Sequence, residues 1–202
     1  MKSTFQKKIC NYYTNKIKTH GKTSKGVDWN DKNSHFLRFE QLDIFYKNKK
    51  SFSILDYGCG YGSLIEYLEK NKYNFEYVGF DISNEMIRQA KIGFPDYKFT
   101  NKLEKKTFDF VVANGIFNVK LDLDSEKWEQ YIFKTINHLN KLSEKGFSFN
   151  ILSSYSDNHM MSKDLFYANP LTFFDYCKKN FSKNVSLIHD YGLYEFTILV
   201  KK

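Results

Sequence analysis

The sequence predicts an α/β fold in which a seven-stranded, mostly parallel sheet is doubly wound, with helices on both faces. From residue 52 onward, short apolar runs alternate with amphipathic helical patterns, which is the order that builds a parallel sheet. Glycines recur at every second position over residues 58–62, directly after the first apolar run. The last two apolar runs are separated only by a short turn around Gly192, so the chain is expected to close with a C-terminal antiparallel hairpin.

Seven strands are expected from apolar runs of strand length. Because strands and helices alternate, the first five are expected to pair in parallel. The expected strands cover residues 52–56, 75–80, 97–100, 108–113, 147–152, 185–189 and 194–200.

Four helices are expected among these strands. Ser83 is a suitable N-cap for one of them, and Gly93 followed by Pro95 ends it. Asn169 before Pro170 is a second N-cap signal, because proline is favoured at the first helical position. The expected helices cover residues 62–70, 84–92, 125–142 and 170–179.

Two more helices, at residues 5–17 and 34–46, are expected before the first strand, with Ser34 as N-cap of the second. We interpret residues 1–48 as an N-terminal helical extension that caps a domain of residues 49–202, and not as a domain of its own. The first 50 residues hold 12 Lys/Arg and 4 Asp/Glu, whereas the rest of the chain is balanced. A basic flap of this kind would attract an anionic acceptor, and the alternative is a solvated, lysine-rich pair of helices.

The cysteine content and the lack of long apolar stretches limit the possible class of protein. Cys10, Cys59 and Cys177 are odd in number and widely spaced, which argues against a disulfide framework or a zinc site. No metal ligands are predicted. No signal-peptide core or membrane-spanning stretch is recognisable. We therefore expect a cytoplasmic protein without a membrane partner.

The glycine-rich turn is the strongest functional signal. Gly58 and Gly60 allow a tight turn and a close approach of the backbone to a ligand. The third glycine of a dinucleotide-binding turn would fall at position 63, which is serine. Asp56, two residues before the first glycine, would repel a pyrophosphate but suits a ligand that carries an ammonium and a sulfonium group. The turn therefore favours a methyl donor over NAD.

A second acid, Asp81, closes the second expected strand, 21 residues after Gly60. A carboxylate at this place can accept hydrogen bonds from both ribose hydroxyl groups of an adenosine. Ile82 and Met86 follow it and are expected to cover the adenine.

With these motifs, residues 50–200 resemble the class I S-adenosylmethionine-dependent methyltransferases, which have a Rossmann-like fold. The family's glycine loop corresponds to Gly58, Gly60 and Gly62, and its ribose-binding acid corresponds to Asp81. The resemblance implies S-adenosylmethionine as cofactor and S-adenosylhomocysteine as product. It also implies that Asn114 lines the methionine end of the cofactor, and that Asn101 lies near the adenine amine.

Residues 26–42 and 153–170 resemble bacterial small-molecule methyltransferases associated with surface-polysaccharide genes. This resemblance implies methylation of an oxygen atom on a sugar, or on a phosphate-like or phosphoramidate group, in polysaccharide biosynthesis. Arg38 is expected to pair with an anionic substrate or the cofactor's carboxylate, or else to be a surface residue. Trp29 is expected to wall the pocket or to plug it. The expected acceptor contacts are Tyr13, His20, Trp29, Arg38, Phe117, Tyr155 and His159.

No catalytic residue is assigned from the sequence. The donor's methyl group is already activated, and positioning contributes more than a general base, which is therefore optional. Any base would be sought among four tyrosines and the five histidines, namely Tyr12, Tyr13, Tyr155, Tyr167, His20, His35, His138, His159 and His189.

Three other functions remain open from the sequence. A nucleic-acid or protein methyltransferase is disfavoured, because residues 114–117 lack the proline pair typical of base-amino methyltransferases. A non-catalytic S-adenosylmethionine-binding module would keep the same glycines and acids. An NAD-dependent oxidoreductase is disfavoured by Asp56 and Ser63. The oligomeric state is not predicted.

Overall fold

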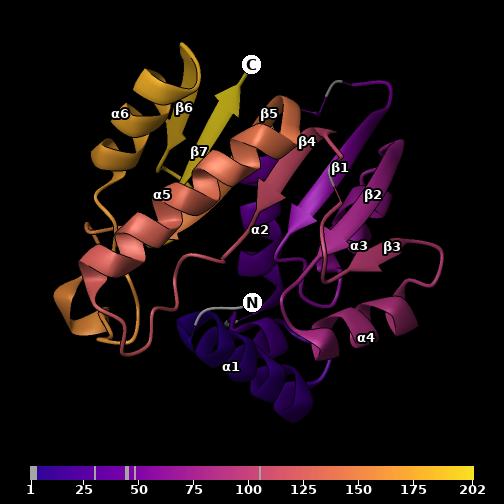
Figure 1. Cartoon of the computed structure of the whole chain (residues 1–202), viewed down its shortest axis with the longest axis horizontal. Helices are drawn as coiled ribbons and strands as arrows, with labels where there is room; N and C mark the ends of the chain where they lie inside the picture. Colours follow the sequence, from indigo (N-terminus) through magenta and orange to yellow (C-terminus); the bar gives the residue numbers. More distant parts are fainter. Residues whose placement is uncertain (1–3, 30, 44–45, 48, 105) are drawn as a thin grey trace.

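The computed structural model describes residues 4–29, 31–43, 46–47, 49–104 and 106–202, and its centre is a seven-stranded sheet. The strand order is β3-β2-β1-β4-β5-β7-β6 (Figure 1). β7 runs antiparallel to β5 and β6, and the remaining neighbours pair in parallel. The strands are β1 (Phe52–Tyr57), β2 (Phe75–Phe80), β3 (Lys98–Thr100), β4 (Phe108–Ala113), β5 (Ser143–Leu152), β6 (Asn184–Ile188) and β7 (Glu195–Lys201).

The helices confirm the alternating pattern expected from the sequence. Ser83 is the N-cap of α4, and its side chain accepts a hydrogen bond from the backbone N–H of Met86. Asn169 caps α6, which begins at Pro170. The helices are α1 (Thr4–His20), α2 (Lys32–Leu42), α3 (Ser63–Lys70), α4 (Asn84–Gly93), α5 (Ser125–Leu142) and α6 (Pro170–Asn180).

The start and end predicted for α2 are wrong. Asp31, not Ser34, is the N-cap, because its carboxylate accepts the hydrogen bond of the Ser34 backbone N–H at 2.9 Å. The helix ends at Leu42, so Tyr46 lies beyond it. Residues 44 and 45, which the prediction included, lie outside the described part of the chain.

Two hydrophobic cores cover the two faces of the sheet. On one face, α5 and α6 pack against the sheet through Trp128, Ile132 and Phe173. On the other face, α2, α3 and α4 bury residues such as Leu64 and Ile87. In the described part of the chain, no helix is both long enough and apolar enough to cross a bilayer.

The strand order reverses between β1 and β4, and this reversal places the site. Connections from these two central strands leave in opposite directions, which opens a crevice at their carboxyl ends. α1 lies across this end of the sheet, beyond the tips of the central strands (Figure 1). Cys10 and Thr14 of α1 contact Ile82 and Ser83, which directly follow β2. The N-terminal helix therefore roofs the crevice.

Candidate active site

The turn after β1 is held open by backbone conformations that favour glycine. Gly58, Gly60 and Gly62 have φ angles of 90°, 55° and 90°. A Cβ atom on Gly60 would lie 2.8 Å from Cγ1 of Val27, so a side chain at this position would intrude on the wall opposite. The turn therefore presents bare backbone to the crevice.

Asp81 fixes the glycine turn from the neighbouring strand. Its Oδ2 accepts a hydrogen bond from the Gly60 N–H at 3.0 Å, and its Oδ1 accepts one from the Ser83 N–H at 2.7 Å. The side chain is largely buried and lines the cavity between these two backbone segments. One carboxylate thus joins the turn after β1 to the start of α4.

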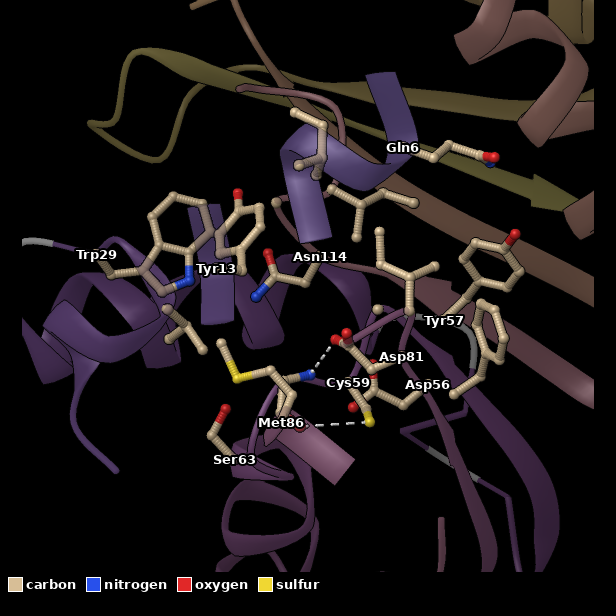
Figure 2. Close-up of a pocket in the computed structure, with 18 of the residues that line it drawn as sticks. Gln6, Tyr13, Trp29, Asp56, Tyr57, Cys59, Ser63, Asp81, Met86 and Asn114 are labelled. Carbon is tan, nitrogen blue, oxygen red and sulfur yellow. Dashed lines mark hydrogen bonds between the residues drawn. The ribbon is translucent and has the colours of Figure 1, made fainter. Parts of the chain in front are cut away.

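A cavity of about 900 Å³ lies between the carboxyl ends of the strands and α1 (Figure 2). The walls come from α1, the segment before α2, the turn after β1, the end of β2 and the loop after β4. Its lining includes Gln6, Tyr13, Val27, Trp29, Asp56, Tyr57, Gly58, Gly60, Ser63, Asp81, Ile82, Met86, Asn114, Gly115 and Tyr131.

Asp56 is buried at the centre of this cavity beside Asp81 (Figure 2). Its Oδ2 accepts a hydrogen bond from the Tyr77 hydroxyl at 2.8 Å. Burial, with a smaller repulsion from Asp81, raises the pKa of Asp56 to about 7, although the Tyr77 hydrogen bond acts in the opposite direction. A cation bound beside Asp56 would favour its charged form.

Asn114 follows β4 and faces the same cavity. Its Oδ1 is buried and accepts no hydrogen bond from any residue that the structure describes. A buried carbonyl oxygen without a partner is costly, so a hydrogen-bond donor on a ligand would satisfy it. Two carboxylates and this oxygen thus contribute hydrogen-bond acceptors to the cavity lining.

The structure brings together most of the residues predicted for cofactor binding. Asp56, the first two glycines of the turn, Asp81, Ile82, Met86 and Asn114 all line the cavity. Two predicted positions do not line it. Gly62 is the N-cap of α3 and packs against Phe94 and Phe99. Asn101 is exposed and donates a hydrogen bond to Asn84.

Four of the residues predicted to contact the acceptor do not line this cavity or the second one that adjoins it. Phe117 is fully buried in the core against Phe149, so it cannot reach a ligand. His20, Tyr155 and His159 are exposed side chains outside the cavity walls. Phe117 thus turns toward the core, and the other three side chains turn toward solvent.

Arg38 is neither a surface residue nor a free cation. It forms a buried ion pair with Glu195 at the start of β7, with a shortest distance of 2.7 Å from Nη2 to Oε1. Its Nη1 donates to the Ser34 carbonyl, and its guanidinium stacks on the Trp29 ring at 3.8 Å. The alternative of a surface residue is therefore wrong, whereas contact of Arg38 with a ligand stays a prediction.

Three cavity residues, Gln6, Tyr57 and Tyr131, were not recognised in the sequence as site residues. The two tyrosines fit the apolar packing pattern of their elements, and Gln6 gives no local signal.

One of the five histidines named as candidate bases also lines the cavity. His35 is buried, with Nε2 3.3 Å from Oγ of Ser63. Burial and the nearby Arg38 lower the pKa of His35 to about 3, so at neutral pH it is an uncharged and weak base.

A second cavity, of about 590 Å³, adjoins the first. The two share the residues Tyr13, Val27, Trp29 and Gly115. The loop that returns to α6 contributes Leu165, which pairs with Val119 in an antiparallel bridge. The remaining lining residues are Asp28, Arg38, Asn118, Leu152 and Glu195.

Comparison with known sequences places these features in context. The family model described as a methyltransferase domain matches residues 29–180, which is more than half of the chain. A relative from Mycobacterium tuberculosis (strain ATCC 25618 / H37Rv), named "Putative methyltransferase Rv1506c", is 47% identical over 156 residues. The match covers 75% of this chain and 93% of the relative.

Solved structures share the fold at low sequence identity. The complex of DhpI with S-adenosylhomocysteine (SAH) has a TM-score of 0.67 at 11% identity, and the match covers 98% of this chain and 97% of DhpI. The plantazolicin methyltransferase BpumL, solved with a desmethyl-plantazolicin analogue and SAH, has a TM-score of 0.64 at 16% identity, with 98% of each chain covered. At these identities the likeness concerns the fold alone.

Proposed function

Since this chain belongs to the methyltransferase-domain family, we propose that the cavity beside the glycine turn binds S-adenosylmethionine and that the enzyme transfers the methyl group to a small molecule. The observation that carries this proposal is the hydrogen bond from the Gly60 N–H to Asp81, because it places a carboxylate beside backbone that bears no side chain. Such a cradle suits a nucleoside whose ribose hydroxyl groups need acceptors.

The remaining walls fit the other end of the same cofactor. Asp56 and the unpartnered Oδ1 of Asn114 are acceptors that suit an ammonium group. Met86 and Ile82 offer apolar surface for an adenine ring. When bound, the cofactor supplies a methyl group activated by its sulfonium.

The chain itself contributes positioning and exclusion of water. Held reactants can gain about 7–11 kcal/mol from correct orientation. Of the five histidines, all within the described residues, His35 alone lines either cavity, and its low pKa makes it a poor proton acceptor. We therefore propose that transfer proceeds by alignment, with no histidine acting as general base.

We propose that residues 1–48 cap the domain of residues 49–202. Support comes from α1, whose Phe5, Ile9 and Tyr13 form part of the cavity lining. Opening of this cap would admit ligands, and closure would shield the reaction from water. The resemblance to methyltransferases of surface-polysaccharide genes supports an acceptor oxygen on a sugar. The buried thiols of Cys59 and Cys177 suit a reducing compartment such as the cytoplasm.

Calorimetric titration of the purified protein with SAH tests the proposed function. We expect saturable binding of one molecule per chain, because the glycine turn and Asp81 form one cradle. NAD is the matched comparison, since it shares the adenosine but carries a pyrophosphate that Asp56 would repel. Binding of NAD in preference to SAH would overturn the proposal.

The affinity for SAH is expected to rise as the pH increases through about 7, where Asp56 loses its proton. The complex favours the carboxylate because SAH carries an ammonium group, so the unliganded protein binds more protons than the complex below this pH. Titrations at about pH 6 and about pH 8 measure the effect. Asp56→Asn, which keeps an acceptor for Tyr77, should bind more weakly and without this pH dependence. A wild-type affinity that is flat over this range would contradict the assignment.

A further inference from the structure

We propose that the second cavity is the acceptor site and that it selects a neutral, hydroxyl-bearing ring over a phosphorylated one. This inference rests on the proposed function, because it takes the first cavity to hold the methyl donor. The four residues common to both cavities show that the two cavities adjoin. A methyl group presented where the cavities meet would face an acceptor in the second cavity.

The charges around the second cavity are already paired within the protein. Arg38 is bound by Glu195, whose Oε2 also accepts a hydrogen bond from Asn150 at 2.5 Å. Asp28 is bound by Lys16 at 2.6 Å and accepts a hydrogen bond from the Tyr12 hydroxyl at 2.7 Å. Among the described lining residues, no charged group lacks a counter-charge.

Because the charged lining residues are already in ion pairs, the second cavity disfavours a charged acceptor. A phosphate group moved into this cavity would lose its water. Arg38, the one cation among the described lining residues, is already engaged by a buried carboxylate. An ammonium group would meet the same difficulty at Asp28. A neutral acceptor avoids this cost, and this reverses the preference for an anion that the basic N-terminal segment suggested.

The uncharged part of the lining suits a ring with an apolar face and a polar edge. Trp29 and Tyr13 contribute aromatic surface, and Val119, Leu152 and Leu165 contribute aliphatic surface. The carboxylates and the side chain of Asn118 add polar atoms to the same walls. Carboxylate oxygens that are already paired still have lone pairs for hydroxyl donors.

Gly115 lies where the two cavities adjoin, and there is no room for a side chain at this position. Its φ angle is 71°, and a Cβ atom there would lie 2.3 Å from Cζ2 of Trp29. Its N–H donates a hydrogen bond to Oδ1 of Asn150, and Nδ2 of Asn150 donates one to Glu195. The indole thus lies close to the loop after β4 and to the Arg38 guanidinium.

Matched acceptor pairs test the selection. Methyl glycosides of glucose, galactose, mannose and rhamnose would each be compared with the corresponding sugar 1-phosphate, following formation of SAH from S-adenosylmethionine. We expect kcat/KM for the neutral member of a productive pair to exceed that of the phosphate by at least about tenfold, because the phosphate is desolvated without a free cation. Preference for the phosphate, or methylation of no neutral member, would overturn the proposal.

Two substitutions at Leu165 connect this preference to the second cavity. Leu165→Trp should raise the acceptor KM about tenfold by filling the space, with an unchanged affinity for SAH. Leu165→Lys adds an unpaired cation to the wall and should reduce the preference for the neutral member about tenfold. Leu171→Lys, at an exposed position of α6, is the control and should change neither quantity.

The binding measurement separates the two proposals. If the wild-type protein does not bind SAH, the proposed function itself would be overturned. Normal SAH binding together with unaltered acceptor kinetics in both Leu165 variants would overturn only the acceptor site. Because Leu165→Lys changes a preference and not only a rate, a general loss of stability would not imitate its effect.

Discussion

Replacing Arg38 with alanine is expected to lower the free energy of unfolding by about 3–5 kcal/mol, the cost typical of breaking a buried ion pair. The reason lies in Glu195, which is 1% exposed and receives hydrogen bonds from Arg38 and from Asn150. Without the guanidinium, its carboxylate would stay buried with only the amide as partner. The Trp29 ring would also lose the cation stacked on it at 3.8 Å.

Urea-induced unfolding of the wild-type and Arg38→Ala proteins measures this loss of free energy of unfolding. Lys8→Ala is a suitable control, because it removes an ion pair with Asp122 that lies on the surface and contributes little. The double variant Arg38→Met, Glu195→Met should recover most of the loss, since neither charge then remains buried. An Arg38→Ala protein as stable as the wild type would show that Glu195 finds another partner or reaches water.

The Asp81→Ala variant is expected to bind SAH about a hundredfold more weakly, because charged hydrogen bonds contribute roughly 1.5–3 kcal/mol each. The expected contact with the ribose would be lost. In addition, the N–H groups of Gly60 and Ser83 would lose their acceptor, and both residues are buried. The glycine turn would no longer be held in its open form.

Calorimetric titration with SAH measures this change. Asp96→Ala removes an acid from an exposed turn of the same domain and should leave the affinity unchanged. Circular dichroism would establish that the Asp81 variant keeps its fold. An unaltered affinity in a folded Asp81→Ala protein would remove this carboxylate from the site.

The parts of the site that could be predicted from the sequence depend on local signals. The glycines of the turn need their φ angles wherever the rest of the chain lies, and an acid that ends the neighbouring parallel strand must come close to them. The same holds for Ser83 and Asn169, whose capping roles depend on the next few residues alone. Fold, turn and Asp81 were therefore within reach of sequence reasoning.

The parts that could not be predicted depend on distant contacts. Arg38 and Glu195 are 157 residues apart, and nothing near either residue indicates its partner. The roof formed by α1 depends on contacts such as that of Thr14 with Ser83. Phe117 illustrates the converse error, since its place after β4 was read as exposure to a ligand, whereas its ring turns into the core.

Trp29 and Gly115 line both cavities, so ligands bound in the two cavities would influence each other's affinity. A ligand in one cavity that shifts the Trp29 indole would change the surface that a ligand in the other cavity contacts. Thermodynamic reciprocity then requires that each molecule changes the other's affinity by the same factor. Arg38, which stacks on the indole and is paired with Glu195 of β7, would limit the movement of the indole and so the strength of this coupling.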